Sequence, residues 1–395
     1  MKTIYDFNFK NKKALIRVDF NVPMNDKLEI TDDSRIRAAL PTVNKVLSDG
    51  GSVVLMSHRG RPKAKEESLS MAHLLPHLEK LLDQDVLFSD DCIGEKTENK
   101  VKKLKSNDVL MLENLRFYDQ ETKGDANFAE QLSRLGDIYI NDAFGTAHRA
   151  HASTAIIASY FGKNKCFGKL MHDEITNIDK ILKNAKRPLT AIMGGAKVSS
   201  KITIISRLMD TVDNLIIGGG MTYTFIKALG GSVGSSLVES DKLDLALDIL
   251  KLAKEKNVNL LLPSDSLNGN SFSNDANILS SKIDDVQDGY MGLDIEKETI
   301  ANFKKTIESS GAVLWNGPMG VFEMENFSHG TKSIAQALVK ATEKGAFTLV
   351  GGGDSVAAIN KYNLSDKVSY VSTGGGAMLE YLEGKTLPGI AAITE

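Results

Sequence analysis

Short apolar runs, each followed by a loop and then by a stretch with the apolar spacing of a helix, recur along the whole chain. This alternation predicts parallel sheets, because right-handed crossovers through a helix bring each strand back beside an earlier one. The runs expected to form strands are ALIRV, SVVLM, DVLML and DIYI in the first half, and PLTAIM, NLIIG, NLLLP, AVLW, FTLV and VSYV in the second. The sequence therefore predicts an α/β protein with two doubly wound parallel sheets, each with helices on both faces.

The chain is expected to form two domains, because 395 residues exceed what one hydrophobic core usually supports. The halves differ in composition: eight of the ten arginines and six of the seven histidines precede residue 186, whereas 24 of the 33 glycines follow it. Residues 169–187 carry apolar side chains at helical spacing and are followed by Pro188. We expect them to form a helix that joins domain 1–168 to domain 188–378, with a cleft between the two.

The bulk composition excludes several classes of protein. A net charge of −3 gives no general reason to expect a nucleic acid or an anionic membrane as partner. Cys92 and Cys166 lie far apart and outside any CxxC pattern, which argues against a disulfide framework and fits a reducing cytosol. Nowhere do 18 apolar residues run together, and the N-terminus lacks the apolar region of an export signal. We therefore expect a cytoplasmic protein.

In the first half, polar side chains follow the predicted strands at the edge where open parallel sheets bind ligands. They are Asp19, Asn21, His58, Arg61, Arg116, His148, Arg149 and His151, and Arg35 begins the helix after the first loop. A single arginine in a loop is usually only solvated. Several loops that each bring a cation to one edge instead predict a basic pocket for a small ligand with several negative charges, in which Asp19 and Asn21 orient the arginines or accept from a ligand hydroxyl.

In the second half, glycine clusters follow the predicted strands. They begin at Gly194, Gly218, Asn316, Gly351 and Gly374. Unhindered N–H groups and helix N-termini form anion sites, although any single cluster would equally serve a tight turn. Five clusters on one edge favour a chain of phosphates. None matches the GxxxxGK[ST] P-loop or a complete GxGxxG.

Three charged residues lie at these glycine loops. Lys197 and Lys201 are four apart, which predicts that both lie on one face of a helix and reach phosphate oxygens. Asp354 follows a glycine run at the start of a predicted helix. It either caps that helix or holds Mg²⁺ that bridges the phosphates, with Ser355 beside it.

With these stretches assembled, the chain resembles the phosphoglycerate kinase family along nearly its whole length. The blocks that carry the resemblance stand in the family's order: RVDFNVP, SHRGRP, ENLRF, NDAFGTAHRAH, GGAKVSSKI, WNGPMGVFE, GGGDS and STGGGA. The resemblance implies a monomeric glycolytic enzyme that moves a phosphoryl group reversibly between 1,3-bisphosphoglycerate and MgADP, giving 3-phosphoglycerate and MgATP, after the two domains close. Ser200, Arg59 and Met378 depart from the residues frequent in the family, and Ser200 leaves open how the helix with the lysines is tethered.

The resemblance also implies roles for individual residues. Those implied to bind phosphoglycerate are Asp19, Asn21, Arg35, His58, Arg61, Arg116 and Arg149. Those implied to bind the nucleotide are Lys197, Lys201, Gly218, Gly219, Gly220, Gly292, Asn316, Glu323, Gly351, Gly352, Gly353, Asp354, Ser355, Gly374, Gly375 and Gly376. Arg35 and Lys197 are implied to be catalytic, Glu323 to contact the ribose and Asp354 to bind Mg²⁺. Residues 379–395 are implied to return to the first domain.

The implied reaction needs no general base, because the phosphoryl acceptor is a carboxylate that is already deprotonated at neutral pH. Two other classes would share parts of the pattern. A nicotinamide-dependent dehydrogenase would need a GxGxxG turn with an acidic residue about 20 positions on, which is absent. A two-domain periplasmic binding protein would need a signal peptide and would not need five glycine loops.

Overall fold

The computed structural model describes residues 1–395 and divides them into two compact units. The first comprises residues 1–176 and 386–395, and the second comprises residues 177–385. The division falls inside helix α6 (Lys169–Leu182), which ends before the predicted position 187. Pro188 disfavours helical conformation only at the residue before it, Arg187, and so does not account for the end at Leu182.

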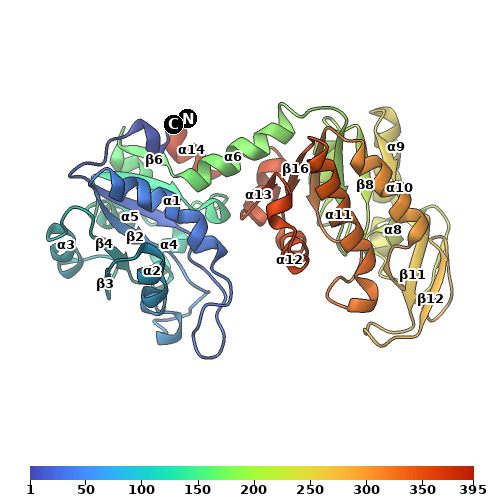
Figure 1. The fold of residues 1–395 in the computed structure, drawn as a ribbon, viewed down its shortest axis with the longest axis horizontal. Coiled ribbons are helices and arrows are strands. Elements are labelled where there is room, and N and C mark those ends of the chain that lie inside the picture. The colour runs from blue at the N-terminus through green and yellow to red at the C-terminus, as the bar shows by residue number, and fades with distance from the viewer. The chain divides into compact units, whose positions relative to one another are not determined.

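The first unit is built on a six-stranded parallel sheet with strand order β3-β4-β2-β1-β5-β6. Its strands are β1 (Lys13–Val18), β2 (Ser52–Met56), β3 (Val86–Ser89), β4 (Val109–Leu112), β5 (Ile138–Asp142) and β6 (Lys165–Phe167). Its helices are α1 (Ser34–Ser48), α2 (Leu75–Leu82), α3 (Glu95–Lys102), α4 (Asp119–Lys123), α5 (Ala126–Ser133) and α14 (Pro388–Thr394). Both ends of the chain pack at β6: Phe167 N–H donates to the carbonyl of Lys2 at 3.0 Å, and α14 lies beside this strand (Figure 1).

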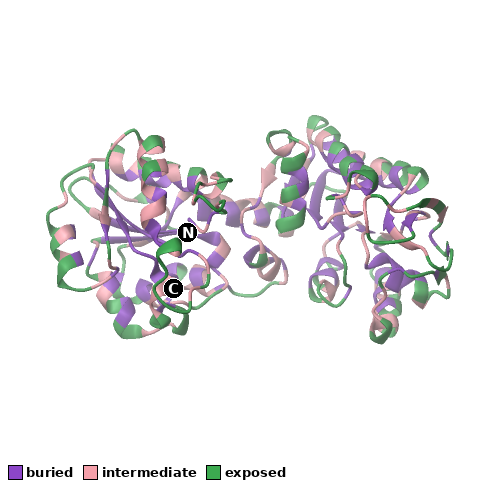
Figure 2. Cartoon of the chain, turned by 90° about the horizontal axis from the view of Figure 1, so that it is seen from below, coloured by how far each residue is buried: buried purple, intermediate pink, exposed green.

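The side chains of β1 divide between the two faces of this sheet, as the period of a strand requires. Ala14, Ile16 and Val18 belong to the core that packs against α1 and α2. Leu15 and Arg17 point to the opposite face, where Leu15 is in register with Tyr139 of β5. Every residue of β2, β4 and β5 is buried, so the sheet lies at the centre of the unit (Figure 2).

The second unit has its own six-stranded parallel sheet, with strand order β10-β8-β7-β15-β16-β17. These strands are β7 (Leu189–Met193), β8 (Asn214–Ile217), β10 (Asn259–Leu261), β15 (Ala312–Asn316), β16 (Phe347–Val350) and β17 (Tyr370–Val371). The helices are α7 (Ile202–Leu208), α8 (Thr222–Ala228), α9 (Leu243–Glu255), α10 (Lys297–Glu308), α11 (His329–Glu343), α12 (Gly353–Lys361) and α13 (Gly376–Leu382). Because α13 packs on α7, the chain rejoins the first unit at Thr386 and not at the predicted residue 379.

Two small sheets were not predicted. One is antiparallel with order β12-β11-β14, and the other pairs β13 with β9. Their strands are β9 (Ser232–Val233), β11 (Asp265–Gly269), β12 (Ile278–Lys282), β13 (Asp285–Val286) and β14 (Met291–Asp294). They carry Ser, Asn, Asp and Gly in place of a continuous apolar run, so their sequence lacks the signal of a buried strand. No helix of the structure is both long enough and apolar enough to span a membrane.

Candidate active site

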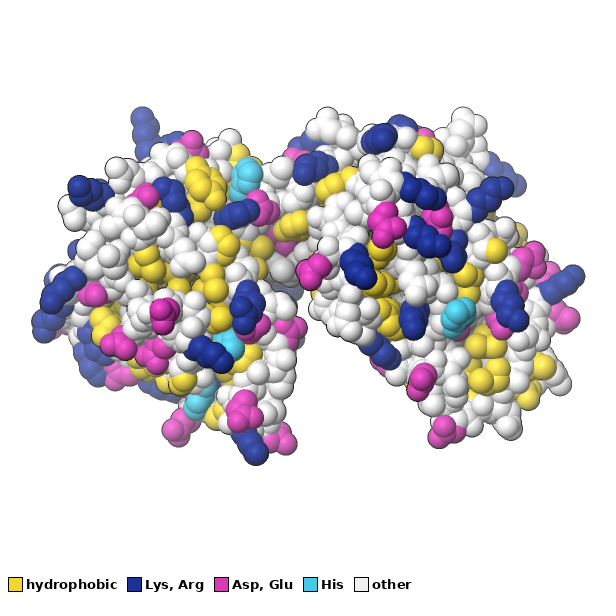
Figure 3. All heavy atoms as spheres, in the orientation of Figure 1, with side chains coloured by type: hydrophobic (Ala, Val, Ile, Leu, Met, Phe, Trp, Pro, Cys, Tyr) yellow, Lys and Arg dark blue, Asp and Glu magenta, His cyan; other side chains and the backbone are white.

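The carboxyl ends of the first sheet carry the basic residues predicted from the sequence. His58 and Arg61 follow β2, Arg116 follows β4, and Arg149 follows β5. The side chains of Arg61, Arg116 and Arg149 line one surface cavity of about 370 Å³. Lys and Arg are mixed with Asp and Glu over the face drawn in Figure 3, so this basic cavity is a local feature and not part of a generally basic surface.

The arginines at this edge, which we call the basic cluster together with His58 and His151, are of two kinds. Arg61 and Arg149 are exposed, and their guanidinium groups form no hydrogen bond or ion pair within the chain. Arg35 and Arg116 are held in place by neighbours. Arg35 donates to Asp19 Oδ2 at 3.3 Å and to the carbonyl of Asn21 at 3.1 Å, and Arg116 donates to the carbonyl of Gly60 at 2.6 Å. The Asn21 side chain in turn accepts from Gly60 N–H at 2.9 Å, which ties the first loop to the second.

Two histidines at this edge, His58 and His151, are neutral at physiological pH. Burial lowers the pKa of His58 well below its ordinary value, and Arg17, Arg116 and Arg35 lower it further. Burial likewise lowers the pKa of His151 to about 4, and Arg17, Arg116 and Arg149 lower it further. The positive charge of this cluster is therefore carried by the arginines, and the imidazoles offer neutral N–H groups.

The cavity also contains residues that we did not predict as ligands. Tyr118, Asp119 and Thr122 line it, and so does His151, which we noted only as a polar residue after a strand. Arg59 lies outside it: its side chain is buried and donates to the carbonyl of Ser70 at 3.3 Å. Tyr118 is the N-cap of α4, and Asp119 and Thr122 lie in that helix. None of the three carries a sequence signal that distinguishes it from an ordinary surface residue.

The second unit contains a pocket of about 270 Å³ at the carboxyl ends of its parallel strands. Five predicted nucleotide residues line it: Gly219, Gly220, Gly292, Glu323 and Asp354. Glycine is required at two of them. Gly219 has φ +70°, and a Cβ there would lie 2.6 Å from the nitrogen of Gly195. A Cβ at Gly292 would overlap the phenol ring of Tyr223.

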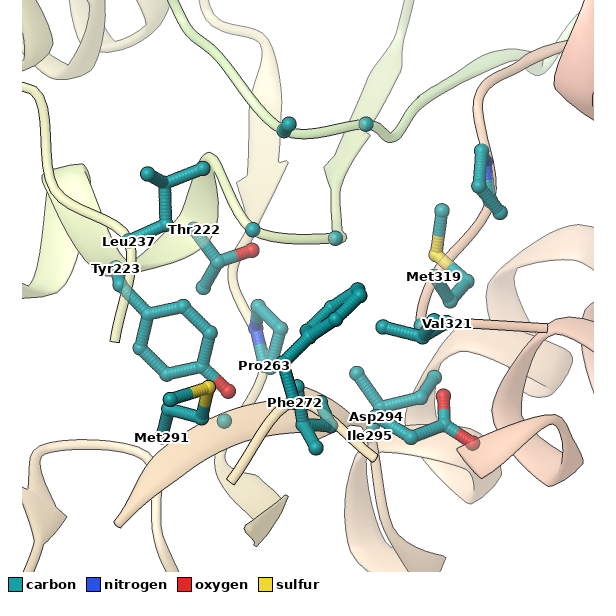
Figure 4. Close-up of a pocket in the computed structure, with 18 of the residues that line it drawn as sticks. Thr222, Tyr223, Leu237, Pro263, Phe272, Met291, Asp294, Ile295, Met319 and Val321 are labelled. Atoms are coloured by element: carbon teal, nitrogen blue, oxygen red, sulfur yellow. The ribbon is translucent and has the colours of Figure 1, made fainter. Parts of the chain in front are cut away.

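One side of this pocket is apolar and was not predicted. Its lining includes Leu237, Pro263, Phe272, Met291 and Val321. The ring of Phe272 projects between Pro263 and Val321 (Figure 4), and 65% of this residue is exposed. An apolar slot beside the glycine loop, in which the N–H of Gly220 forms no backbone hydrogen bond, suits a ligand that has an aromatic ring at one end and phosphates at the other.

A second group of predicted residues forms a hydrogen-bond network behind the pocket. Asn316, at the end of β15, donates to the carbonyl of Gly351 at 2.8 Å and accepts from the ammonium of Lys201. Ser355 is fully buried and accepts from Gly317 N–H at 2.6 Å. Burial lowers the pKa of Lys201, and Asp354 opposes that effect. These hydrogen bonds connect the loops after β7, β15 and β16 at the carboxyl ends of the strands of the second sheet.

The remaining predicted glycines lie at the same edge but outside the pocket lining. Gly218 packs against Met319, and Gly352 packs against the side-chain amide of Asn316. Gly353 begins α12 with open space around its Cα, whereas Gly351 lies against the thioether of Met378. Gly374, Gly375 and Gly376 form the turn into α13, in which Gly375 has φ +50°.

The expectation that Lys197 and Lys201 share a helix face is wrong. Helix α7 begins only at Ile202, and both lysines lie in the turn that precedes it. Serine accounts for the delayed start, because its hydroxyl competes with helical hydrogen bonds. Ser200 donates to the carbonyl of Lys197 at 2.8 Å, and Ser199 donates to Glu239 at 2.5 Å. The contact with Glu239 is what tethers this loop, and the ammonium of Lys197 has no partner within the chain.

The alternative that Asp354 caps a helix is not met. Gly352 occupies the N-cap position of α12, and no side chain forms a capping hydrogen bond there. Asp354 stands in the first turn, exposed and without a partner. Its carboxylate is therefore available to a ligand or a cation at the pocket.

Comparison with known proteins identifies the family. The family model described as phosphoglycerate kinase matches residues 4–385. The phosphoglycerate kinase of Porphyromonas gingivalis is 54% identical over 415 residues that cover 99% of each chain. The cytosolic phosphoglycerate kinase 3 of Arabidopsis thaliana is 49% identical and covers 100% of this chain and 98% of its own.

Solved structures agree with this assignment. The phosphoglycerate kinase of Coxiella burnetii superposes with a TM-score of 0.90 at 41% identity, covering 99% of this chain and 98% of its own. That of Pyrococcus horikoshii superposes with a TM-score of 0.86 at 31% identity, covering 100% of this chain and 98% of its own. The family model, the relatives and the solved structures agree, and the chain belongs to the phosphoglycerate kinase family.

Proposed function

We propose that this chain transfers a phosphoryl group reversibly from 1,3-bisphosphoglycerate to MgADP, giving 3-phosphoglycerate and MgATP, in glycolysis and gluconeogenesis. The observation that carries the proposal is the division of two anion sites between two units. Free arginines line the cavity of the first unit, and glycine loops with an apolar slot line the pocket of the second. We further propose that the enzyme acts as a cytoplasmic monomer.

The basic cluster is proposed to bind phosphoglycerate. Arg61 and Arg149 suit the phosphate that is not transferred, because both guanidinium groups are free to donate two hydrogen bonds each to its oxygens. Arg116 and His58 add donors that their neighbours already hold in place. Arg35, oriented by Asp19, is proposed to face the carboxyl end of the ligand, where transfer takes place.

The pocket of the second unit is proposed to bind the nucleotide. The apolar slot around Phe272 and Val321 suits a purine base, and Glu323 suits the ribose hydroxyls. The N–H group of Gly220 suits the phosphates, as does Lys201, which its contact with Asn316 directs to this edge. Lys197 is proposed to meet the transferring phosphoryl group.

Asp354 is the residue that fits a magnesium ion. It is an exposed carboxylate without a partner at the pocket, and the chain has no group of three acidic, histidine or cysteine residues that would hold a metal alone. Magnesium is commonly bound by one or two carboxylates together with substrate phosphates, and this arrangement matches a single aspartate. When bound, the ion would neutralise negative charge on the nucleotide phosphates.

The proposed mechanism is direct in-line transfer after the units close. Since the acceptor is a carboxylate, the enzyme has to align the reactants and neutralise charge, and no residue has to remove a proton. Reacting atoms must come within about 3 to 3.5 Å. Arg35 belongs to the first unit and Lys197 to the second, so closure is proposed to bring both to the transferring group.

A coupled assay of ATP consumption tests this function directly. We expect consumption only when 3-phosphoglycerate and Mg²⁺ are both present, and we expect calorimetry to detect MgADP binding but no NADH binding. A folded protein that consumes no ATP in the presence of 3-phosphoglycerate would overturn the proposal. Binding of NADH would favour a dehydrogenase, and binding of 3-phosphoglycerate without turnover would favour a binding protein.

A further inference from the structure

Arg17 lies behind the basic cluster and was not predicted as a site residue. It belongs to β1, on the face of the sheet opposite α1 and α2, and it is fully buried. Its Nε donates to Ser153 Oγ at 2.8 Å, Nη1 donates to the carbonyl of Val18, and Nη2 lies 3.1 Å from His58 Nδ1. A buried guanidinium is strongly unfavourable unless it is paired, so this set of contacts calls for an explanation.

The contact with His58 determines which ring nitrogen carries the proton. Arginine has only donors and keeps its proton at any physiological pH. Nδ1 of His58 must therefore accept the hydrogen bond, and the neutral ring carries its proton on Nε2. Nε2 has no hydrogen-bond partner within the chain, so it is left as a donor for a ligand.

A buried acid balances the charge of Arg17. Glu121 is fully buried, accepts from Ser153 Oγ at 2.6 Å and accepts from Ser153 N–H at 3.0 Å. Ser153 thus connects Glu121 to Arg17, and Arg17 connects to His58. The charged or titratable groups that face His58 are Arg17 on β1, Arg116 after β4, Arg35 on α1 and His151 after β5. None of them is an anion that would favour a protonated imidazole.

We propose that Arg17 is a positioning residue that holds His58 as the neutral tautomer with its proton on Nε2, so that His58 presents one fixed N–H donor to phosphoglycerate. The proposal rests on the proposed function insofar as phosphoglycerate is the ligand. It requires that His58 keep the same protonation state between pH 6 and 8. The pH dependence of KM for 3-phosphoglycerate then follows the ionisation of the ligand's phosphate and not that of His58.

Nitrogen NMR of the ligand-free protein tests the tautomer itself. Long-range proton–nitrogen spectra resolve the two nitrogens of each of the seven histidines, and a His58→Gln variant assigns the signals of His58. We expect an unprotonated Nδ1 and a protonated Nε2 from pH 6 to 8. A proton on Nδ1, or a doubly protonated ring at pH 7, would overturn the proposal. Because no ligand is needed, this result does not depend on the proposed function.

Kinetics of Arg17→Lys test the consequence for the substrate. Lysine keeps the charge but lacks the rigid fork that reaches Ser153, Val18 and His58 together. We expect mixed tautomers of His58, a KM for 3-phosphoglycerate raised about tenfold as for one lost charged hydrogen bond, and a kcat within about twofold of wild type. The matched control is Arg37→Lys on α1, which changes an exposed arginine that pairs only with Asp33.

Three outcomes separate the possible failures. An Arg17→Lys enzyme with unchanged KM and an unchanged His58 spectrum contradicts the positioning role. If Arg17→Lys does not fold, the wild-type spectrum alone decides the tautomer. If the tautomer is as expected but the wild-type protein does not bind 3-phosphoglycerate, the proposed function fails while the placement of the proton on His58 stands.

Discussion

The charged side chains of the two candidate sites differ in whether they form hydrogen bonds or ion pairs within the chain. Arg61, Arg149, Lys197 and Asp354 have no partner within the chain. Each can therefore pair with a charged ligand without first breaking a contact within the protein. Arg35, Arg116 and Lys201 already contact Asp19, Gly60 and Asn316, respectively. Groups held in this way need little reorganisation when charge develops during transfer, which is the condition for electrostatic catalysis.

The role of Asp354 is tested by Asp354→Asn. We expect MgADP binding to weaken on the order of tenfold because one charged ligand is lost, while thermal stability stays the same because the side chain forms no hydrogen bond in α12. Asp244→Asn is a matched control, since Asp244 also stands in the first turn of a helix but does not line the pocket. Unchanged Mg²⁺ dependence with a lowered Tm would indicate that Asp354 stabilises the helix instead.

Trp315 offers a fluorescent report on the nucleotide site. This residue, the only tryptophan of the chain, is fully buried at the end of β15, and its Nε1–H donates to the carbonyl of Gly317 at 2.8 Å. Its neighbour Asn316 belongs to the network around Lys201. We expect saturating MgADP to change the emission spectrum, because Asn316, the next residue, is a proposed nucleotide contact. Emission that does not respond to MgADP would show that the indole does not sense the loop.

At the scale of elements, the sequence predicted the strands with continuous apolar runs. All ten runs form strands of the two parallel sheets. It did not predict β3 and β6, which are short, or the antiparallel sheet of β11, β12 and β14. β12 alternates between partly and fully exposed residues and owes its place to pairing with β11 and not to burial of an apolar face. Long-range pairing of this kind leaves little local signal.

The antiparallel sheet also contains a buried acid whose titration predicts a pH-dependent stability. Burial raises the pKa of Asp294 on β14 from its ordinary value to about 7. Because the folded state binds this proton more tightly than the unfolded state, the stabilisation is complete below about pH 4 and is lost as the pH rises through 7. Burial raises the pKa of Asp142, at the end of β5 in the first unit, in the same way.

We expect Asp294→Asn to flatten this dependence. Asparagine is neutral at all pH values and keeps an oxygen for the N–H of Gly330, which lies 2.7 Å from Asp294 Oδ2. From pH 5 to pH 8.5, the wild-type protein should lose about 2 kcal/mol more unfolding free energy than the variant. Urea unfolding at both pH values measures the difference, and Asp288→Asn in an exposed turn is the control. Equal losses in wild type and Asp294→Asn would mean that Asp294 is ionised throughout.

At the scale of the whole molecule, the two sites could be predicted more fully than the environment that supports them. Most of the charged residues of the two candidate sites could be singled out because they stand after an apolar run, at the edge where parallel sheets bind ligands. Arg17 and Glu121 were not, since their roles depend on burial against Ser153, which no spacing encodes. The apolar slot around Phe272 was missed for a similar reason, because β11, β14 and their loops assemble it from distant segments.

The division of labour between the units is the central claim, and steady-state kinetics of three variants test it most directly. At saturating MgATP, Arg61→Ala should mainly raise KM for 3-phosphoglycerate, since a group that holds the non-transferring phosphate binds ground and transition states alike. Lys197→Ala and Arg35→Ala should instead lower kcat on the order of 100-fold, as expected for loss of one preorganised group at the transferring phosphoryl. A Lys197→Ala enzyme with near wild-type kcat, or equal kcat losses in all three variants, would contradict the account.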